Sequence, residues 1–105
     1  MADAYKTLYQ GQLPNSVSTL ATVGAAKSWI VKHISIVNTT SGVVTFALYK
    51  NGTTDAYRWT PTISVPALGS SEWDGTEAMA AAEYWAGVAS AVTSLTCTIS
   101  GDEVS

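Results

Sequence analysis

The chain has 105 residues, of which 47% are hydrophobic and 12% are charged, and its formal net charge at pH 7 is −3. This length suits one domain with a modest core, and so low a charged fraction leaves much of the polar surface to Ser, Thr, Asn and Gly. The five basic residues are scattered and form no stripe that could neutralise phosphates, so we expect no nucleic-acid partner.

Short β-branched and aromatic runs, separated by clusters of Gly, Pro, Asn and Ser, predict about seven strands. Pro61 and Pro66 indicate strand ends or sheet edges, because proline cannot donate to a ladder, and Asn51-Gly52 is a strong hairpin signal. We therefore expect an all-β fold, a single-domain antiparallel β-sandwich that is jelly-roll-like and spans 1–105, with tails at 1–4 and 101–105. The runs that favour strands are 5–13, 18–23, 28–38, 43–50, 55–60, 62–65, 84–89 and 94–100.

The run SWIVKHISIVN over 28–38 is the strongest strand signal, because it is dense in β-branched residues. Its apolar side changes along the run. Trp29 and Val31 share one parity, whereas Ile34 and Ile36 share the other. A bulge, or burial on both faces, would produce such a change.

The strand pattern weakens between residues 67 and 83. We interpret 67–75 as a loop that continues through Glu72-Trp73-Asp74-Gly75. The segment TEAMAAAE over 76–83 is rich in Ala, Met and Glu, which are good helix formers. We expect a short helical turn or an irregular loop there.

The segment 94–100 has the cleanest period-two pattern of the chain. Leu95, Cys97 and Ile99 alternate with Thr and Ser, which predicts a buried Cys97 thiol. As the chain has one cysteine, no intrachain disulfide can form. No apolar run approaches the roughly 20 residues of a membrane span, and the N-terminus has no apolar signal region. We expect synthesis in the cytoplasm and no membrane partner.

Candidate catalytic groups are few. A Cys-His mechanism would require His33, the one histidine, to lie beside Cys97, and we favour a histidine that packs or hydrogen-bonds within its strand. Glu72 and Asp74 flank Trp73, so in a strand both carboxylates would point the same way, as in a glycosidase pair. We favour a solvated loop edge. One histidine and one cysteine cannot assemble the usual zinc site, so we predict no catalytic residue, metal or cofactor.

Four Trp and five Tyr are many aromatic residues for so small a chain. Three roles stay open for them: core packing, a protein interface and carbohydrate binding. An exposed aromatic with an interleaved cation is most expected at Tyr57-Arg58-Trp59, and the N-terminal strand could pair with a neighbour's sheet edge by strand addition. The candidate interface residues are Tyr5, Leu8, Tyr9, Leu13, Tyr57, Arg58, Trp59 and Trp73.

The order of four motifs is similar to that in a group of small virion proteins of tailed bacteriophages. An opening "LY-x-G-QL" strand is followed by a "VK-x-I-x-(I/V)-VNT" strand, an "LY-x-NG" hairpin and a terminal "T-x-x-ISG-x-E" strand. The resemblance runs from Lys6 to Val104. The helix-prone 76–83 departs from the strand-and-turn character expected of that group.

The resemblance implies a non-enzymatic virion structural protein, made in the host cytoplasm. Its most direct role would be that of a decoration or cement protein, which stabilises the capsid surface and self-associates, as a homotrimer in many such proteins. The alternative is a small tail- or fibre-associated module that contributes to attachment to host-surface carbohydrate. Both roles involve other virion proteins, a major capsid or a tail protein, and the sequence does not separate head from tail.

Overall fold

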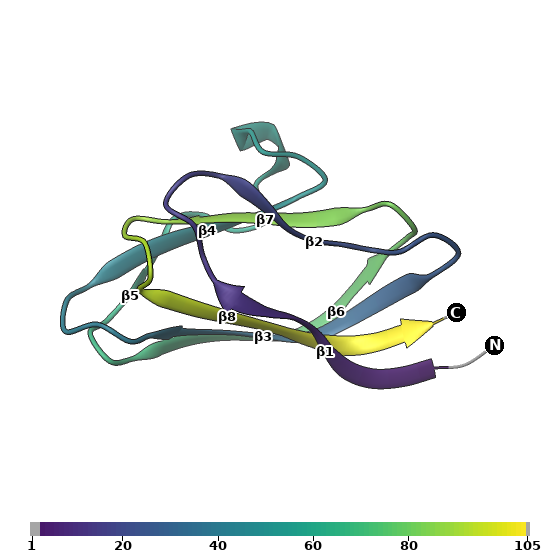
Figure 1. Ribbon diagram of the computed structural model, residues 1–105, viewed down its shortest axis with the longest axis horizontal. Coiled ribbons are helices and arrows are strands. Elements are labelled where there is room, and N and C mark those ends of the chain that lie inside the picture. Colours follow the sequence, from purple (N-terminus) through teal and green to yellow (C-terminus); the bar gives the residue numbers. More distant parts are fainter. Residues whose placement is uncertain (1–2, 105) are drawn as a thin grey trace.

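The computed structural model describes residues 3–104 as two four-stranded antiparallel sheets packed face to face (Figure 1). One sheet has the strand order β1-β8-β3-β6, and the other has the order β2-β7-β4-β5. The strands are β1 (Asp3–Gln12), β2 (Ser18–Thr22), β3 (Ser28–Asn38), β4 (Val44–Lys50), β5 (Ile63–Val65), β6 (Ser70–Met79), β7 (Tyr84–Ala89) and β8 (Leu95–Val104), and a 3₁₀ helix, η1, covers Asp55–Tyr57.

The connections wrap the two sheets around one core. Every link between consecutive strands crosses from one sheet to the other, apart from the link between β4 and β5. Eight strands in this order form a jelly roll. The expected all-β sandwich of jelly-roll type is therefore confirmed, with eight strands in place of about seven.

The core lies between the sheets and is built by alternate residues of each strand. Leu95, Cys97 and Ile99 of β8 are fully buried, as the period-two pattern predicts. Trp85 of β7 is the largest fully buried side chain of the described chain. The other buried members of this cluster are Leu13, Val23, Trp29, Val31, Ile34, Ile36, Val44, Phe46, Leu48, Val65, Met79 and Ala89.

A bulge in β3 explains the change of apolar side along that strand. The pairing of β3 with both neighbours shifts between Val31 and His33, so Trp29 and Val31 point into the core before the shift, and Ile34 and Ile36 after it. Gly101 of β8 lies opposite Val31 at this place. A Cβ on Gly101 would meet the Ile30 carbonyl oxygen at 2.2 Å, so the close approach of the two backbones requires glycine.

The expected helical turn or loop over 76–83 is wrong for its first half. Thr76 to Met79 belong to β6, where Met79 pairs with Trp29 and is buried. Long-range pairing and burial outweigh the helix propensity of Ala, Met and Glu. The following residues form a turn, in which Ala82 has a φ of 70°. The expected loop over 67–75 is confirmed for 67–69 and wrong for the rest, since β6 begins at Ser70.

The expected strand over 55–60 is wrong too. After Asn51, which has a φ of 63°, the chain leaves the sheet as a projecting excursion that contains η1 (Figure 1). It touches β4 again through an isolated bridge between Tyr49 and Arg58, and regular pairing resumes at β5. Asn51 is engaged elsewhere, because its side chain bonds Glu83 and the Tyr84 amide, so the dipeptide Asn51-Gly52 does not close a two-residue hairpin.

The expected tails are wrong for residues 3–4 and 101–104, which are paired in the sheet. β1 begins at Asp3, β8 ends at Val104, and these two residues pair with each other. The sheet therefore includes residues 3–4 and 101–104, and residues 1, 2 and 105 lie outside the described part of the chain. The start of β1 and the end of β8 therefore lie at the same end of the sandwich (Figure 1).

Candidate functional site at the open edge of the sandwich

The two edges of the sandwich differ. At one edge β1 lies over β2, and at the other edge β6, with ten residues, faces β5, with three. Within residues 3–104 no strand pairs with the outer side of β6. This side of β6 is therefore a long free strand edge, a feature that natural sheets usually shorten or cover.

The register shows which backbone groups of β6 are free. The Asn38 amide donates to the Gly69 carbonyl (2.8 Å), so hydrogen-bonded pairs of this antiparallel ladder recur at Ser71 and Trp73. The residues between them, Ser70, Glu72 and Asp74, direct their N–H and C=O groups away from β3. Because side chains alternate with the pleat, Glu72 and Asp74 stand on the outer face of the sheet, whereas Trp73 points inward.

An apolar groove of about 150 Å³ opens between the edges of the two sheets. Its floor consists of core residues of β3 and β4, and its rim is formed by β6 on one side and by the chain before β5 on the other. We call it the β5/β6 groove. Its lining residues are Ile34, Ile36, Phe46, Leu48, Trp59, Thr60, Ile63, Ser71, Glu72 and Trp73.

The groove exists because β5 is short. Where a continuing β5 would pair with β4, Thr60 takes its place, and the Leu48 amide donates to the Thr60 hydroxyl (2.9 Å). The Trp59 amide in turn donates to the Leu48 carbonyl (2.9 Å). Pro61 follows and has no amide with which to extend the ladder. The backbone groups of Leu48 on β4 are thus hydrogen-bonded without a neighbouring strand, and the core stays accessible at this place.

Three tryptophans connect the core to the rim of the groove. Trp59 lies between Trp73 and Trp85, with both ring centroids at 4.8 Å and interplanar angles of 80° and 85°. Such edge-to-face contacts are favourable beyond the area that they bury. Trp85 is fully buried, and its Nε1 has no hydrogen-bond partner in the described part of the chain. Trp59 and Trp73 are half-buried, so their rings remain partly available at the surface.

The outer face beside the groove carries negative charge. The side chains of Glu72 and Asp74 are 54% and 83% exposed. His33 of β3 lies between them, with Nδ1 2.6 Å from Asp74 Oδ1 and Nε2 3.4 Å from Glu72 Oε1. The preferred sequence interpretation, a strand histidine that hydrogen-bonds, describes this contact. The carboxylates lie on a strand, however, so the expected loop edge is wrong.

His33 and Cys97 lie on opposite faces of their sheet, because His33 is on the outer face and Cys97 points into the core. Their side chains therefore cannot form a Cys-His pair. Burial raises the pKa of the Cys97 thiol to about 12, so the reactive thiolate is scarce at neutral pH. Among residues 3–104 no group of three or more His, Cys, Asp and Glu side chains is placed to hold a metal ion.

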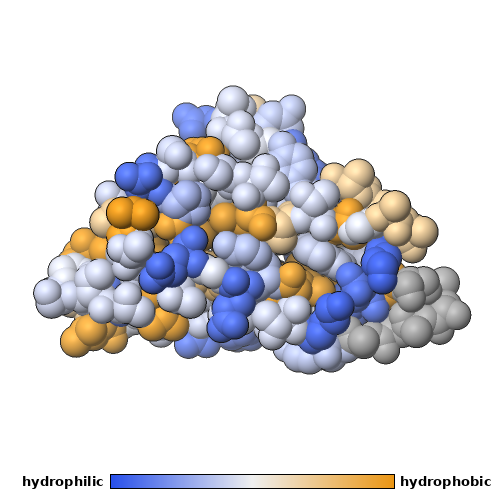
Figure 2. All heavy atoms as spheres, in the orientation of Figure 1, coloured by the Kyte–Doolittle hydropathy of each residue, from blue (hydrophilic) through white to orange (hydrophobic). Residues whose placement is uncertain are grey.

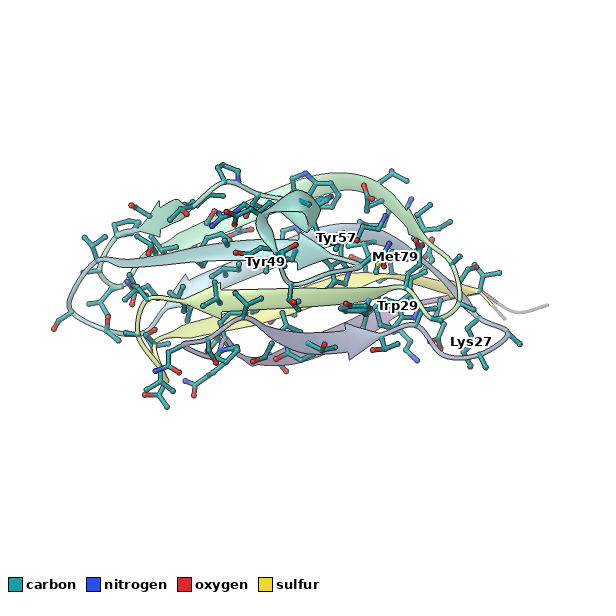
Figure 3. All side chains as sticks on the ribbon, turned by 90° about the horizontal axis from the view of Figure 1, so that it is seen from above. Lys27, Trp29, Tyr49, Tyr57 and Met79 are labelled. Atoms are coloured by element: carbon teal, nitrogen blue, oxygen red, sulfur yellow. The ribbon has the colours of Figure 1, made fainter. Side chains whose placement is uncertain are left out.

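The structure divides the predicted interface residues between the two edges of the sandwich. Trp59 and Trp73 meet at the β5/β6 groove. Arg58 beside them donates to Asp55 (2.9 Å), which raises the arginine pKa, and stacks over the Tyr49 ring at 5.3 Å. Tyr57 on η1 is 49% exposed and lies over the same sheet as Tyr49 (Figure 3).

The other four predicted interface residues belong to β1 and the turn that follows it. Tyr5 is 65% exposed, whereas Leu8, at a bulge, and Tyr9 are half-buried against the core. Burial and the nearby Cys97 raise the pKa of Tyr9. Leu13 is 1% exposed, so its assignment to an interface is wrong, and it is a core residue. β1 pairs with β8 on one side, so only its other side could pair with a strand of a neighbouring molecule.

Sequence reasoning missed Ser71, Glu72, Thr60 and Ile63 as parts of one site. The signal that could have found them is the alternation around Trp73, in which the half-buried Ser71 and Trp73 alternate with exposed residues. The sequence interpretation places Ser71 and Glu72 in a loop, and Thr60 and Ile63 in two separate strands.

Further exposed apolar residues lie outside the groove. Figure 2 shows hydrophobic atoms at several separate places on the face in view. Val43, Leu68 and Val92 stand on the three loops that follow β3, β5 and β7. These loops are neighbours, because the Leu68 amide donates to the Thr40 carbonyl and the Thr39 amide donates to the Ser94 carbonyl. None of these three residues belongs to a strand, so their loops offer no free strand edge to a partner.

Two further findings concern the class of protein to which this chain could belong. In the described part of the chain no helix is long and apolar enough to cross a membrane. Comparisons with protein-family models, curated proteins and solved structures found no match to this chain.

Proposed function

We propose that this chain is a non-enzymatic structural protein of a bacteriophage particle, a decoration protein that binds the assembled capsid and stabilises it. The observation that carries the proposal is the β5/β6 groove with the free edge of β6 beside it. A strand edge and an apolar groove together form a surface for another protein. The motif order from Lys6 to Val104, which is similar to that of small phage virion proteins, supports a particle as that partner.

The physical requirements of a decoration protein agree with the described chain. Jelly rolls are common among viral capsid proteins, which is support by analogy of fold alone. A repeated subunit collects many modest contacts into tight attachment, so one small groove on each copy is sufficient. Low charge limits repulsion between neighbouring copies, and self-association into trimers belongs to the same proposal.

The test uses particles of the virus whose genome encodes this chain. Particles purified on a density gradient should contain the chain in a fixed ratio to the major capsid protein, measured by quantitative mass spectrometry. Particles that lack it should lose DNA at a lower temperature, and purified chain added back should restore retention. A chain found in the lysate and missing from washed particles would refute the proposal.

The alternative function, a tail- or fibre-associated module that binds host-surface carbohydrate, is favoured by one observation. The half-exposed rings of Trp59 and Trp73 lie beside Glu72 and the Thr60 hydroxyl, and aromatic faces with nearby polar groups bind sugar rings. An antibody against the chain should then label tails in micrographs, and a glycan array should give specific binding. Label on the head and a blank array would reject this alternative.

A further inference from the structure

We infer that the β5/β6 groove and the free edge of β6 bind an extended segment of a partner protein, which adds as an antiparallel strand, inserts one apolar side chain into the groove and places basic residues beside Glu72 and Asp74. This inference rests on the proposed function, because it names how a particle protein would hold the chain.

The backbone requirement comes from β6. Ser70, Glu72 and Asp74 direct their amides and carbonyls outward, so an added antiparallel strand finds three residues prepared for paired hydrogen bonds. In a sheet, two residues directly opposite each other on neighbouring strands place their side chains on the same face. The residues of the added strand that bond to Glu72 and Asp74 therefore carry their side chains on the outer face.

The apolar requirement comes from the groove. The residue of the added strand opposite Trp73 points inward, toward the opening above Ile34, Ile36 and Leu48. The groove volume of about 150 Å³ is close to that of an apolar cavity that admits a benzene molecule. One leucine or phenylalanine side chain is the size of group that this space takes, and burying it would supply most of the affinity.

The charge requirement comes from the outer face of β6. Glu77 is already paired with Lys50. Glu72 and Asp74 face His33, and in the described part of the chain no lysine or arginine is paired with them. Lysine or arginine at the outward positions of the added strand would satisfy both carboxylates. The partner segment should thus alternate basic and apolar residues.

A second copy of this chain does not meet these requirements. The strands of a folded copy direct their inner side chains into their own core, as Leu95, Cys97 and Ile99 of β8 do. A copy could therefore offer a backbone edge but no inward apolar side chain for the groove. An extended segment of a different protein offers both.

The experiment measures binding of synthetic peptides to the full chain by isothermal titration calorimetry. The probe is an acetylated, amidated nonapeptide with lysine at its even positions, valine at its odd positions and leucine at its centre. Two forms carry N-methyl groups, either on alternate lysines or on the alternating apolar residues. In antiparallel addition the lysine amides face β6, so methylation there should abolish binding, whereas methylation of the apolar residues should change the affinity less than about threefold.

Variants of the chain test the other two requirements. Neutralising both carboxylates in Glu72→Gln with Asp74→Asn should weaken binding about fivefold, since two exposed ion pairs are lost. Ser71→Phe, which fills the groove from its rim, should abolish binding while thermal unfolding shows an intact fold. Asp102→Asn, a carboxylate at the far end of β8, is the matched control and should bind as the native chain does.

The inference would be overturned if the two N-methylated peptides bound with equal affinity, if the peptide methylated on its lysines bound more tightly, or if no peptide bound at millimolar concentration. It would also be overturned if the chain self-associated with rising concentration and Ser71→Phe removed that self-association. These outcomes are independent of the particle test. If the peptides fail and the chain still purifies with particles, the mode of attachment is wrong and the proposed function stands. If the peptides bind and particles lack the chain, the proposed function fails.

Discussion

Asn38 should be the most costly polar side chain to remove, because it ties the loop after β3 to the end of β5 and the residue that follows it. Asn38 is 1% exposed. Its Nδ2 lies 2.8 Å from the Gly42 carbonyl, 3.1 Å from that of Val65 and 3.2 Å from that of Pro66. Its Oδ1 accepts from the amide (2.9 Å) and the hydroxyl (2.8 Å) of Thr40.

The expected loss for Asn38→Ala follows from these contacts. The two Nδ2 hydrogens serve three carbonyls, so about two donated and two accepted hydrogen bonds disappear, at about 1 kcal/mol each. The free energy of unfolding should therefore fall by about 4 kcal/mol. At roughly 4–8 °C per kcal/mol for a domain of this size, Tm should fall by about 20 °C. Asn38→Asp should lose at least as much, because a carboxylate would then face the carbonyls of Val65 and Pro66.

The assay is urea unfolding followed by tryptophan fluorescence, with the slope m compared between proteins to confirm that the transition stays two-state. Asn15→Ala is the matched control, because Asn15 is exposed, and it should change the free energy of unfolding by less than about 0.5 kcal/mol. A loss below about 1.5 kcal/mol for Asn38→Ala would refute the reasoning, since other contacts would then hold the two segments together.

Three further predictions concern other parts of the fold. Gly101→Ala should cost more than about 3 kcal/mol or prevent folding, because its Cβ would collide with the backbone at Ile30, and Gly42→Ala, where no atom lies within 4 Å, is the control in the same urea assay. Glu103 accepts hydrogen bonds from Trp29 and a lysine, which lower its pKa from 4.5 to about 2. Its contribution to stability should therefore be full above pH 4.5 and be lost as the pH falls toward 2. Glu103→Gln should flatten this acidic part of a plot of unfolding free energy against pH, and an unchanged plot would contradict the assignment. The Cys97 thiol, buried and with a pKa of about 12, should react with a thiol reagent in urea and not in the native protein; rapid native labelling would show that the core opens.

Local patterns were sufficient for part of the fold. The alternation of Leu95, Cys97 and Ile99 predicts β8. The change of parity in β3 indicates either a bulge or burial on both faces, and the structure contains the bulge. Both signals arise within one strand, where the period of the side chains reports burial directly.

The remaining elements depend on contacts that a local pattern does not contain. The 76–79 segment has helix-forming residues, and only its pairing with β3 keeps it extended. The excursion after Asn51 is stabilised by Glu83, which lies far away in the sequence. Local propensity and long-range contacts disagree at both places, and the long-range contacts prevail.

The candidate site was predicted in fragments. Trp59 and Trp73 were both expected at an interface, yet their contact results from the short β5 and from the position of β6 at a sheet edge. Strand order is not readable from side-chain periodicity, so the groove between these strands could not be predicted.

The most direct measurement of the central claim is cosedimentation of purified chain with particles that lack it. The native chain and Asp102→Asn should sediment with the particles to the same saturating level, and Ser71→Phe, with its groove filled, should stay in the supernatant. Equal sedimentation of Ser71→Phe, or failure of the native chain to sediment, would contradict the account.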